Sequence, residues 1–429
     1  MVKKFLRFLK HPTSTQIIIN TIGNYLNVFF TAFFAFLLVR LMNPVDYGTL
    51  SVLLGIAYVL ANILDLGVSA SIYSYLPPLL EKKTERLFSF LKTTFFYQTI
   101  FAAIVIFFLF LTFPSLDKIF FKTQAPWWEL YLTTLSVLFL IWQNYAANSL
   151  LAAKRVFQAN LYLNLSNLFK TFFIFILIFL NKVNIANIIF SFGILGPLIY
   201  FFLLFFEKKH VVFRIAKAPV KKKEFRFNFT LTYFFASQFF NLGTRMDLFL
   251  LSFYFPKSAL VGYYGLSTKI ILTLFAAVSS ITQVLSPDFA KVKTKEELKI
   301  LLKKSFAYLL LPTGLFFLLF LTPKEVFQIA FTKKFIPATE ITHVLALAYI
   351  AYPLLNIPTL YFLYTVKMPK YILITNFIFF ISISFFCLIF IPKLNAYGGP
   401  LSVFFSLLFS SCFLIYTFIK SLNNPANSS

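Results

Sequence analysis

The sequence of 429 residues contains little charge, and most of the charge it does contain is positive. Only 12% of the residues are charged, about half the share in a typical soluble protein, whereas 59% are hydrophobic. Polar residues are therefore too few to cover a water-soluble fold of this length. A chain with this composition needs the lipid bilayer as its solvent.

Other absences exclude several classes of function. The two cysteines, Cys387 and Cys412, both lie in apolar runs, so no disulfide framework is expected. The three histidines are scattered, which gives no metal cluster, and no cofactor is expected beyond a coupling Na⁺ or H⁺. A phosphate-binding loop for ATP is missing. The loops on the outer side are short and carry no acidic pair, which argues against a membrane enzyme that builds glycans.

Long apolar runs are what the sequence does contain. Each run is close to the roughly 20 residues that a helix needs to cross the hydrocarbon core. Because backbone groups in lipid must bond within their own segment, the runs predict helices and an all-α polytopic membrane protein. We expect about twelve spans, at 15–38, 49–76, 88–113, 127–151, 157–180, 184–206, 229–255, 262–286, 303–322, 339–365, 370–391 and 399–420.

The net charge of +25 is distributed in a way that predicts orientation. One set of alternate loops, together with both termini, holds roughly three times as many Lys and Arg as the opposite set. The excess predicts that both termini are cytoplasmic. Since the basic residues form no single patch, we expect no nucleic-acid partner.

The chain is predicted to divide into two six-helix halves. We expect an N-terminal bundle at 1–206, a basic cytoplasmic linker at 207–228, a C-terminal bundle at 229–420 and a disordered tail at 421–429. The linker is interpreted as a solvated topology anchor, with binding to anionic lipid as the alternative. A shift of 217 residues aligns the halves weakly, because "DYGTLS" at 46–51 then overlies "YYGLS" at 263–267. Repeats of this kind are common in transporters, with the substrate path between them.

Amide side chains recur at helical spacing inside several predicted spans. Such stripes either bond helices together or line a polar cavity, and a cavity is favoured here. The stripe residues chosen as candidate contacts for a polar substrate are Asn24, Asn27, Asn164 and Asn241.

Charged residues at membrane depth give a second set of candidates. Arg245, Lys170 and Lys269 lie within predicted spans, and Arg40 ends the first one. They either snorkel and pair structurally, or they make a cavity attractive to an anion such as phosphate.

Two acidic residues and two prolines complete the candidates. Asp65 and Asp247 either pair with a basic residue or bind a coupling cation or proton. Pro353 and Pro358 are predicted to kink or break the tenth span.

Three ordered motifs resemble those of bacterial polysaccharide flippases. The first half has an Arg that ends helix 1, then P-x-x-Y-G, then D-x-G in helix 2, at Arg40, Pro44, Tyr47, Gly48, Asp65 and Gly67. The second half has an acidic residue in helix 7 followed by G-Y, at Asp247, Gly262 and Tyr263. The segment 391–408 is similar to the loop that precedes the last helix in that family.

The resemblance implies the multidrug/oligosaccharidyl-lipid/polysaccharide exporter superfamily, with two pseudo-symmetric six-helix bundles around a central cavity. It implies a flippase that moves undecaprenyl-pyrophosphate-linked oligosaccharide, such as an O-antigen or capsule unit, to the outer leaflet. The expected partners are this substrate and membrane lipid, with a glycan polymerase complex as a further candidate. A multidrug exporter of the same superfamily and, less favoured, a membrane glycan polymerase or ligase remain alternatives.

Overall fold

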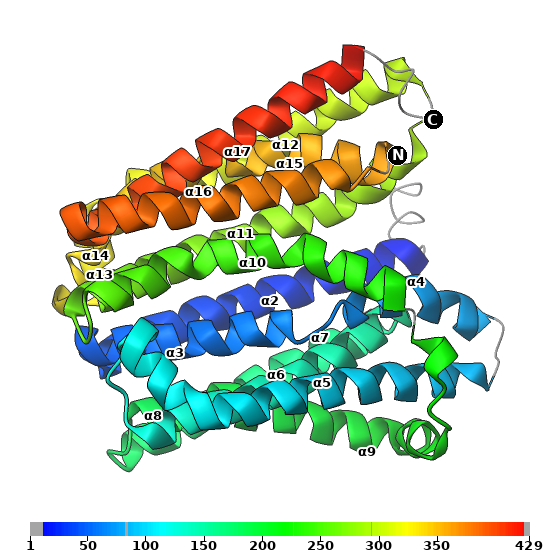
Figure 1. Cartoon of the computed structure of the whole chain (residues 1–429), viewed down its shortest axis with the longest axis horizontal. Helices are drawn as coiled ribbons and strands as arrows, with labels where there is room; N and C mark the ends of the chain where they lie inside the picture. Colours follow the sequence, from blue (N-terminus) through cyan, green and yellow to red (C-terminus); the bar gives the residue numbers. More distant parts are fainter. Residues whose placement is uncertain (1–11, 82–84, 226, 293, 367, 424–429) are drawn as a thin grey trace, which may run out of the picture. The chain divides into compact units, whose positions relative to one another are not determined.

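The computed structural model describes residues 12–81, 85–225, 227–292, 294–366 and 368–423. Within these ranges the secondary structure is helical, with no strand, which confirms the predicted all-α class. The α-helices are α2 Pro12–Leu41, α3 Pro44–Ile63, α4 Val68–Glu81, α5 Arg86–Leu116, α6 Trp127–Ala152, α7 Val156–Phe179, α8 Ile185–Phe190, α9 Gly196–Lys217, α10 Phe227–Tyr254, α11 Ala259–Lys291, α12 Lys295–Phe320, α13 Lys324–Phe331, α14 Ala338–Tyr349, α15 Tyr352–Leu360, α16 Lys370–Leu394 and α17 Gly398–Asn423 (Figure 1).

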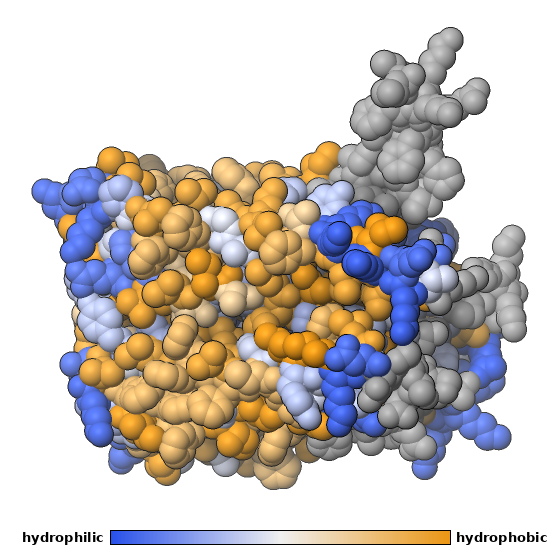
Figure 2. Space-filling view, turned by 90° about the horizontal axis from the view of Figure 1, so that it is seen from above, coloured by the Kyte–Doolittle hydropathy of each residue, from blue (hydrophilic) through white to orange (hydrophobic). Residues whose placement is uncertain are grey.

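Ten segments of the described chain are long and apolar enough to cross a membrane. One of them, Lys370–Asn423, contains both α16 and α17, which lie side by side in Figure 1. Hydrophobic side chains cover the middle of the face shown in Figure 2, and hydrophilic ones gather toward its two ends. The protein is therefore a multi-pass membrane protein, and the number of about twelve spans stays a prediction.

The helices group into two compact units. Unit 1 comprises residues 1–34, 53–116 and 125–235, and unit 2 comprises residues 35–52, 117–124 and 236–429. The core of unit 1 includes fully buried Ala57, Ala102 and Val137, where α3, α5 and α6 pack. The end of α2 and the start of α3 group with the second unit, and the predicted domain boundaries at 207–228 stay a prediction.

The predicted second span is not continuous. Helix α3 ends at Ile63 and α4 begins at Val68, because the chain turns through left-handed conformations at Leu66 (φ 53°) and Gly67 (φ 73°). Such a conformation costs a glycine little, so Gly67 is suited to this turn. The expectation of one helix over 49–76 is wrong, because the D-x-G motif ends one helix and starts another.

The predicted break in the tenth span is confirmed. Helix α14 ends at Tyr349 and α15 begins at Tyr352, so that Pro353 lies in the first turn of α15. Proline is tolerated there because the first amide groups of a helix lack intrahelical partners. Pro358 lies inside α15, directly before the π-helical segment Tyr361–Thr365.

The basic linker is folded onto unit 1. Helix α9 is kinked at Lys208, whose φ of −119° and ψ of 28° are not helical, and a further helical stretch runs to Lys217. Beyond it, Arg86 pairs with Glu224 at 2.7 Å, and the Ser89 hydroxyl donates to the Pro219 carbonyl at 2.7 Å. Phe225 is buried. Residues that follow α9 therefore pack against the start of α5, while basic side chains of the segment such as Lys209, Lys217 and Lys221 are exposed. The role of the linker as a solvated anchor stays a prediction.

In unit 2, the motif at residues 44–48 packs against the motif at residues 261–265. A Cβ atom on Gly262 would overlap the Pro44 carbonyl oxygen, and one on Gly48 would lie 2.7 Å from the Gly262 nitrogen. One on Gly265 would lie 2.6 Å from the Ser51 hydroxyl. The glycines in both motifs are therefore used for close contact between α3 and α11.

Candidate functional site

The amide stripes of α2 and α7 face each other within unit 1. The Asn167 amide donates to the Asn27 side-chain oxygen at 3.0 Å, and the Asn164 amide donates to the Gly23 carbonyl at 3.3 Å. Gly23 permits this approach, because a Cβ there would overlap the Asn160 side chain. At this interface the stripes bond the two helices together, as one of the two interpretations of the sequence predicts.

Asn24 belongs to the same stripe but has a different environment. It is half-buried, and its side chain makes no hydrogen bond to any other residue in the described part of the chain. The Asn164 oxygen is buried and likewise has no hydrogen-bond partner there. The Asn24 side chain and the Asn164 oxygen can therefore still form hydrogen bonds, at an interface where other amide groups already bond the two helices together.

On α7, Asn160, Asn164 and Asn167 form a row of amide side chains, called the amide ladder, and Lys170 follows it on the same face of the helix. It lies three residues after Asn167, so the two side chains leave the same side of the helix. Lys170 is only 9% exposed, and its ammonium lies 5.3 Å from the ring centre of Phe192 and 5.7 Å from that of Phe34. Its aliphatic stem packs where Gly196 leaves room. The result is a buried cation beside two aromatic rings at the end of an amide ladder.

Asp65 caps helix α4. Its carboxylate accepts from the Ser69 backbone N–H at 3.1 Å, from the Ser69 hydroxyl at 2.9 Å and from the Gln98 amide at 2.9 Å. The Asn148 amide donates to the same Ser69 hydroxyl at 2.6 Å. Among the described residues, no basic side chain forms a salt bridge with Asp65. Its bonds to the first turn of α4 are a sufficient structural reason for this acidic residue, and its ion-coupling role stays a prediction.

Asp247 lies in the core of unit 2. It is 2% exposed and accepts a hydrogen bond of 2.5 Å from the Tyr264 hydroxyl. The Tyr264 ring packs directly over Gly399, where a Cβ would lie 2.6 Å from the ring. Three segments that the sequence marks separately, in α10, α11 and α17, therefore meet at one buried hydrogen bond.

The remaining predicted residues of unit 2 are distributed over three helices. Asn241 and Arg245 are half-buried on α10, and Lys269 is half-buried on α11. Arg40 is exposed at the end of α2, where it donates to the Ile329 carbonyl at 2.9 Å and lies over the Phe36 ring. The bond from Arg40 ties the end of α2 to α13, and the substrate-binding roles of all four residues stay predictions.

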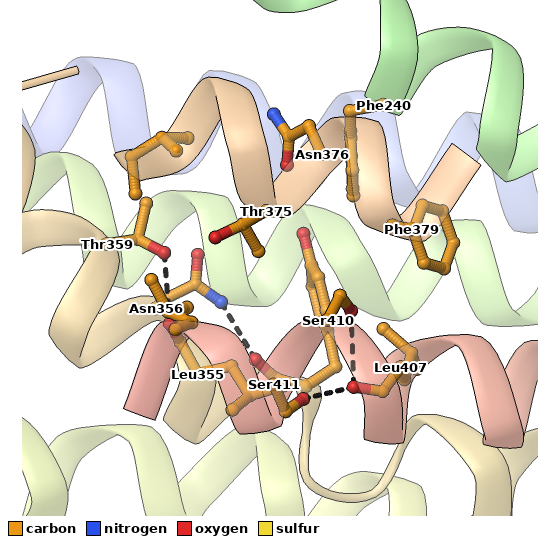
Figure 3. A pocket seen from close by; sticks show the side chains of 13 residues that line it. Phe240, Leu355, Asn356, Thr359, Thr375, Asn376, Phe379, Leu407, Ser410 and Ser411 are labelled. Atoms are coloured by element: carbon orange, nitrogen blue, oxygen red, sulfur yellow. Dashed lines mark hydrogen bonds between the residues drawn. The ribbon is translucent and has the colours of Figure 1, made fainter. Parts of the chain in front are cut away.

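A cavity in unit 2 was not predicted from the sequence. It has a volume of about 180 Å³ and lies among α10, α15, α16 and α17. Its polar lining consists of Tyr352, Asn356, Thr359, Thr375, Asn376, Ser410 and Ser411. Figure 3 shows the side-chain oxygens of Asn356, Thr359 and Thr375 directed toward a common space. These residues form no long stripe on any one helix, so the only signal in the sequence is isolated polar groups in apolar runs.

Fold and membrane-spanning helices place the chain in the class of multi-pass helical membrane proteins. The chain belongs to the polysaccharide biosynthesis protein family, whose family model matches residues 14–293. This match confirms the resemblance that the sequence motifs indicate. No curated protein matches the sequence significantly.

Several solved structures share the fold. Lipid II flippase MurJ in an inward closed conformation aligns with a TM-score of 0.70 at 16% identity, over 95% of this chain and 89% of that one. A multidrug resistance MATE family transporter of the MOP superfamily, inward-facing, gives 0.70 at 11% identity, over 95% and 94%. A MOP superfamily transporter from Pyrococcus furiosus gives 0.63 at 14% identity, over 97% and 98%. These structures confirm that the predicted fold is shared with solved flippase and transporter structures.

Proposed function

We propose that this protein is a flippase for undecaprenyl-pyrophosphate-linked oligosaccharide, such as an O-antigen or capsule repeat unit. It moves this substrate from the cytoplasmic to the outer leaflet of a bacterial inner membrane by alternating access. Family membership supports a role in polysaccharide biosynthesis. The distribution of basic residues supports cytoplasmic termini.

The observation that carries the proposal is the buried cation of unit 1. Keeping a lysine at membrane depth costs about 2.5–3.5 kcal/mol on insertion scales. Lys170 is 9% exposed near the middle of α7, where its ammonium lies 5.3 Å from the ring centre of Phe192 at the end of a row of amide side chains. A phosphate group attracts an ammonium as a point charge. The amide groups beside it, Asn24 and Asn164, have unused capacity for sugar hydroxyls.

The other proposed contacts extend the same chemistry. Arg245, Lys269 and Arg40 would neutralise further charge on the pyrophosphate, and Arg suits phosphate through its planar fork. Asn27 and Asn241 would bind sugar. Coupling to Na⁺ or H⁺ would use Asp247 or Asp65, and the deep burial of Asp247 supports it as the first of the two to test.

A deletion strain tests this function. We expect lipid-linked repeat units to accumulate at the cytoplasmic face, surface glycan to be lost, and the wild-type gene to restore it. Lys170→Gln should reduce the restored glycan at least tenfold at normal protein level, whereas Lys170→Arg should keep more activity. Lys182→Gln is the matched control, because Lys182 is exposed just beyond α7. Full restoration by Lys170→Gln would refute the cationic site.

The deletion strain also distinguishes the flippase from the alternative function. A cation-coupled multidrug exporter remains in view because a MATE family transporter shares the fold. The buried Asp247 is the type of residue that a cationic drug would require. Increased drug sensitivity with unchanged surface glycan would favour that function over the flippase.

A further inference from the structure

The cavity of unit 2 is polar without being charged. None of the residues that line it is acidic or basic. An ion placed in such a cavity would lose its hydration without gaining a countercharge, which is costly in a low-dielectric interior. The lining therefore disfavours phosphate, carboxylate and ammonium groups as occupants.

The hydrogen bonds within the lining decide what a ligand must provide. The hydroxyls of Thr359, Thr375 and Ser410 donate to carbonyls one turn earlier on their own helices, at 3.0, 2.8 and 2.8 Å. The Asn356 amide donates to the Tyr352 carbonyl at 3.0 Å. Since these donors are used, the oxygens of Asn356, Thr359, Thr375 and Ser410 remain as acceptors, whereas the Asn376 amide and the Tyr352 hydroxyl can also donate. A ligand that fits this lining carries hydrogen-bond donors and acceptors together, as hydroxyl groups do.

Aromatic rings form another part of the lining. The Phe240 ring is stacked on Tyr352, with centres 6.3 Å apart and planes 13° apart, and lies 6.0 Å from Phe379. All three residues line the cavity. An apolar aromatic surface beside oxygen acceptors matches a sugar ring, whose C–H groups lie on its faces and whose hydroxyls lie at its edge.

The size of the cavity limits the ligand further. Its 180 Å³ equals the space of roughly six water molecules. That space suits a single sugar ring.

We propose that this cavity is a specificity site that binds one uncharged sugar residue of the transported glycan. The inference rests on the proposed flippase function and deepens it. Hydroxyl donors of the sugar bind the oxygens of Asn356, Thr359 and Thr375, and its apolar face packs against the aromatic rings. Recognition of sugar in unit 2 is then chemically distinct from the cationic group at Lys170 in unit 1.

Binding to full-length protein in lipid nanodiscs tests the site. Saturation-transfer NMR would use methyl glycosides of the neutral sugars in the host's surface glycan, with methyl glucuronide as a separate arm. Thermal unfolding followed by circular dichroism, with and without NaCl, would test for binding of a cation. We expect at least one neutral glycoside to bind and the glucuronide not to bind. Thr375→Val should weaken that binding about three- to tenfold, the effect of one lost hydrogen bond. Asn356→Leu should do the same.

Thr417→Val is the matched control. Thr417 makes the same type of bond within α17, to the Phe413 carbonyl at 2.9 Å, but does not line the cavity. It should leave glycoside binding unchanged, and circular dichroism confirms that each variant is folded. Absence of glycoside binding to the wild type, or equal binding by Thr375→Val, overturns the proposal. So does stabilisation by NaCl that is lost in Thr375→Val while no glycoside binds, because the cavity would then be a cation site.

Glycan production separates failure of this site from failure of the flippase function. If the wild-type gene does not restore surface glycan in the deletion strain, the function itself is wrong. If the wild type restores it and Thr375→Val and Asn356→Leu restore it equally, with unaltered glycoside binding, only the sugar site is wrong.

Discussion

The α2–α7 interface of unit 1 and the cavity of unit 2 use the same residue types for opposite results. At the interface, Asn167 and Asn27 bond across two helices. Around the cavity, Thr375 and Asn356 bond to carbonyls of their own helices and leave oxygens free on the other side. Polar residues in a membrane helix therefore bond helices together in one unit and line an open space in the other.

The size of the neighbouring residues explains the difference. Gly23 brings α7 so close to α2 that the Asn160 side chain lies where a Cβ would be. At the cavity, α10 and α15 contact each other through rings, with Phe240 stacked on Tyr352. Small residues let polar groups on two helices reach each other, whereas large rings hold helices apart.

Replacing Gly23 with a larger residue should change the free energy of unfolding more than the other substitutions considered for these two regions. Gly23→Ala puts a methyl group into the Asn160 side chain, and overpacking of this kind costs about 1–3 kcal/mol. We expect the free energy of unfolding to fall by that amount, measured by circular dichroism during titration of the purified protein with SDS in mixed micelles. Gly314→Ala is the matched control, because a Cβ at Gly314 meets nothing within 4 Å. It should be neutral or slightly stabilising. Equal effects at both positions would refute the close-packing explanation.

Breaking the amide pair should have a smaller effect. A double-mutant cycle with Asn27→Leu and Asn167→Leu isolates their interaction, which we expect to be about 0.5–1.5 kcal/mol. The same SDS titration measures each corner of the cycle. A coupling energy near zero would mean that the two amides lie together without holding the helices together.

Part of this comparison is readable from the sequence. The regular spacing of Asn160, Asn164 and Asn167 predicts a polar face on α7, because helical geometry alone puts those residues on one side. Which partner that face meets depends on Gly23, whose role becomes visible only once α2 and α7 are packed. The sequence alone therefore predicts that α7 has a polar face, whereas the contact of that face with α2 depends on tertiary packing.

The cavity is harder to predict because none of its helices carries a stripe. Asn356 and Thr359 lie on α15, Thr375 on α16 and Ser410 on α17. Each looks like a tolerated polar residue in an apolar run, and only packing brings them around one space. The turn at Asp65 is an intermediate case. Its D-x-G sequence contains both an acidic residue that bonds to the first turn of α4 and a glycine suited to positive φ, and these signals favour a break where apolar content predicts a continuous span.

Filling the cavity should have the smallest effect on stability, and in the opposite direction to Gly23→Ala. Ser410→Val removes a hydroxyl that bonds only within its own helix and adds methyl groups to a space of about 180 Å³. Cavity filling commonly adds about 0.5–2 kcal/mol, and the β-branched valine offsets part of this gain in a helix. We therefore expect a change between zero and about 1 kcal/mol of stabilisation in the SDS titration. A destabilisation as large as that of Gly23→Ala would show that the lining is packed as tightly as the α2–α7 interface. The contrast between a bonded and an open polar region would then be wrong.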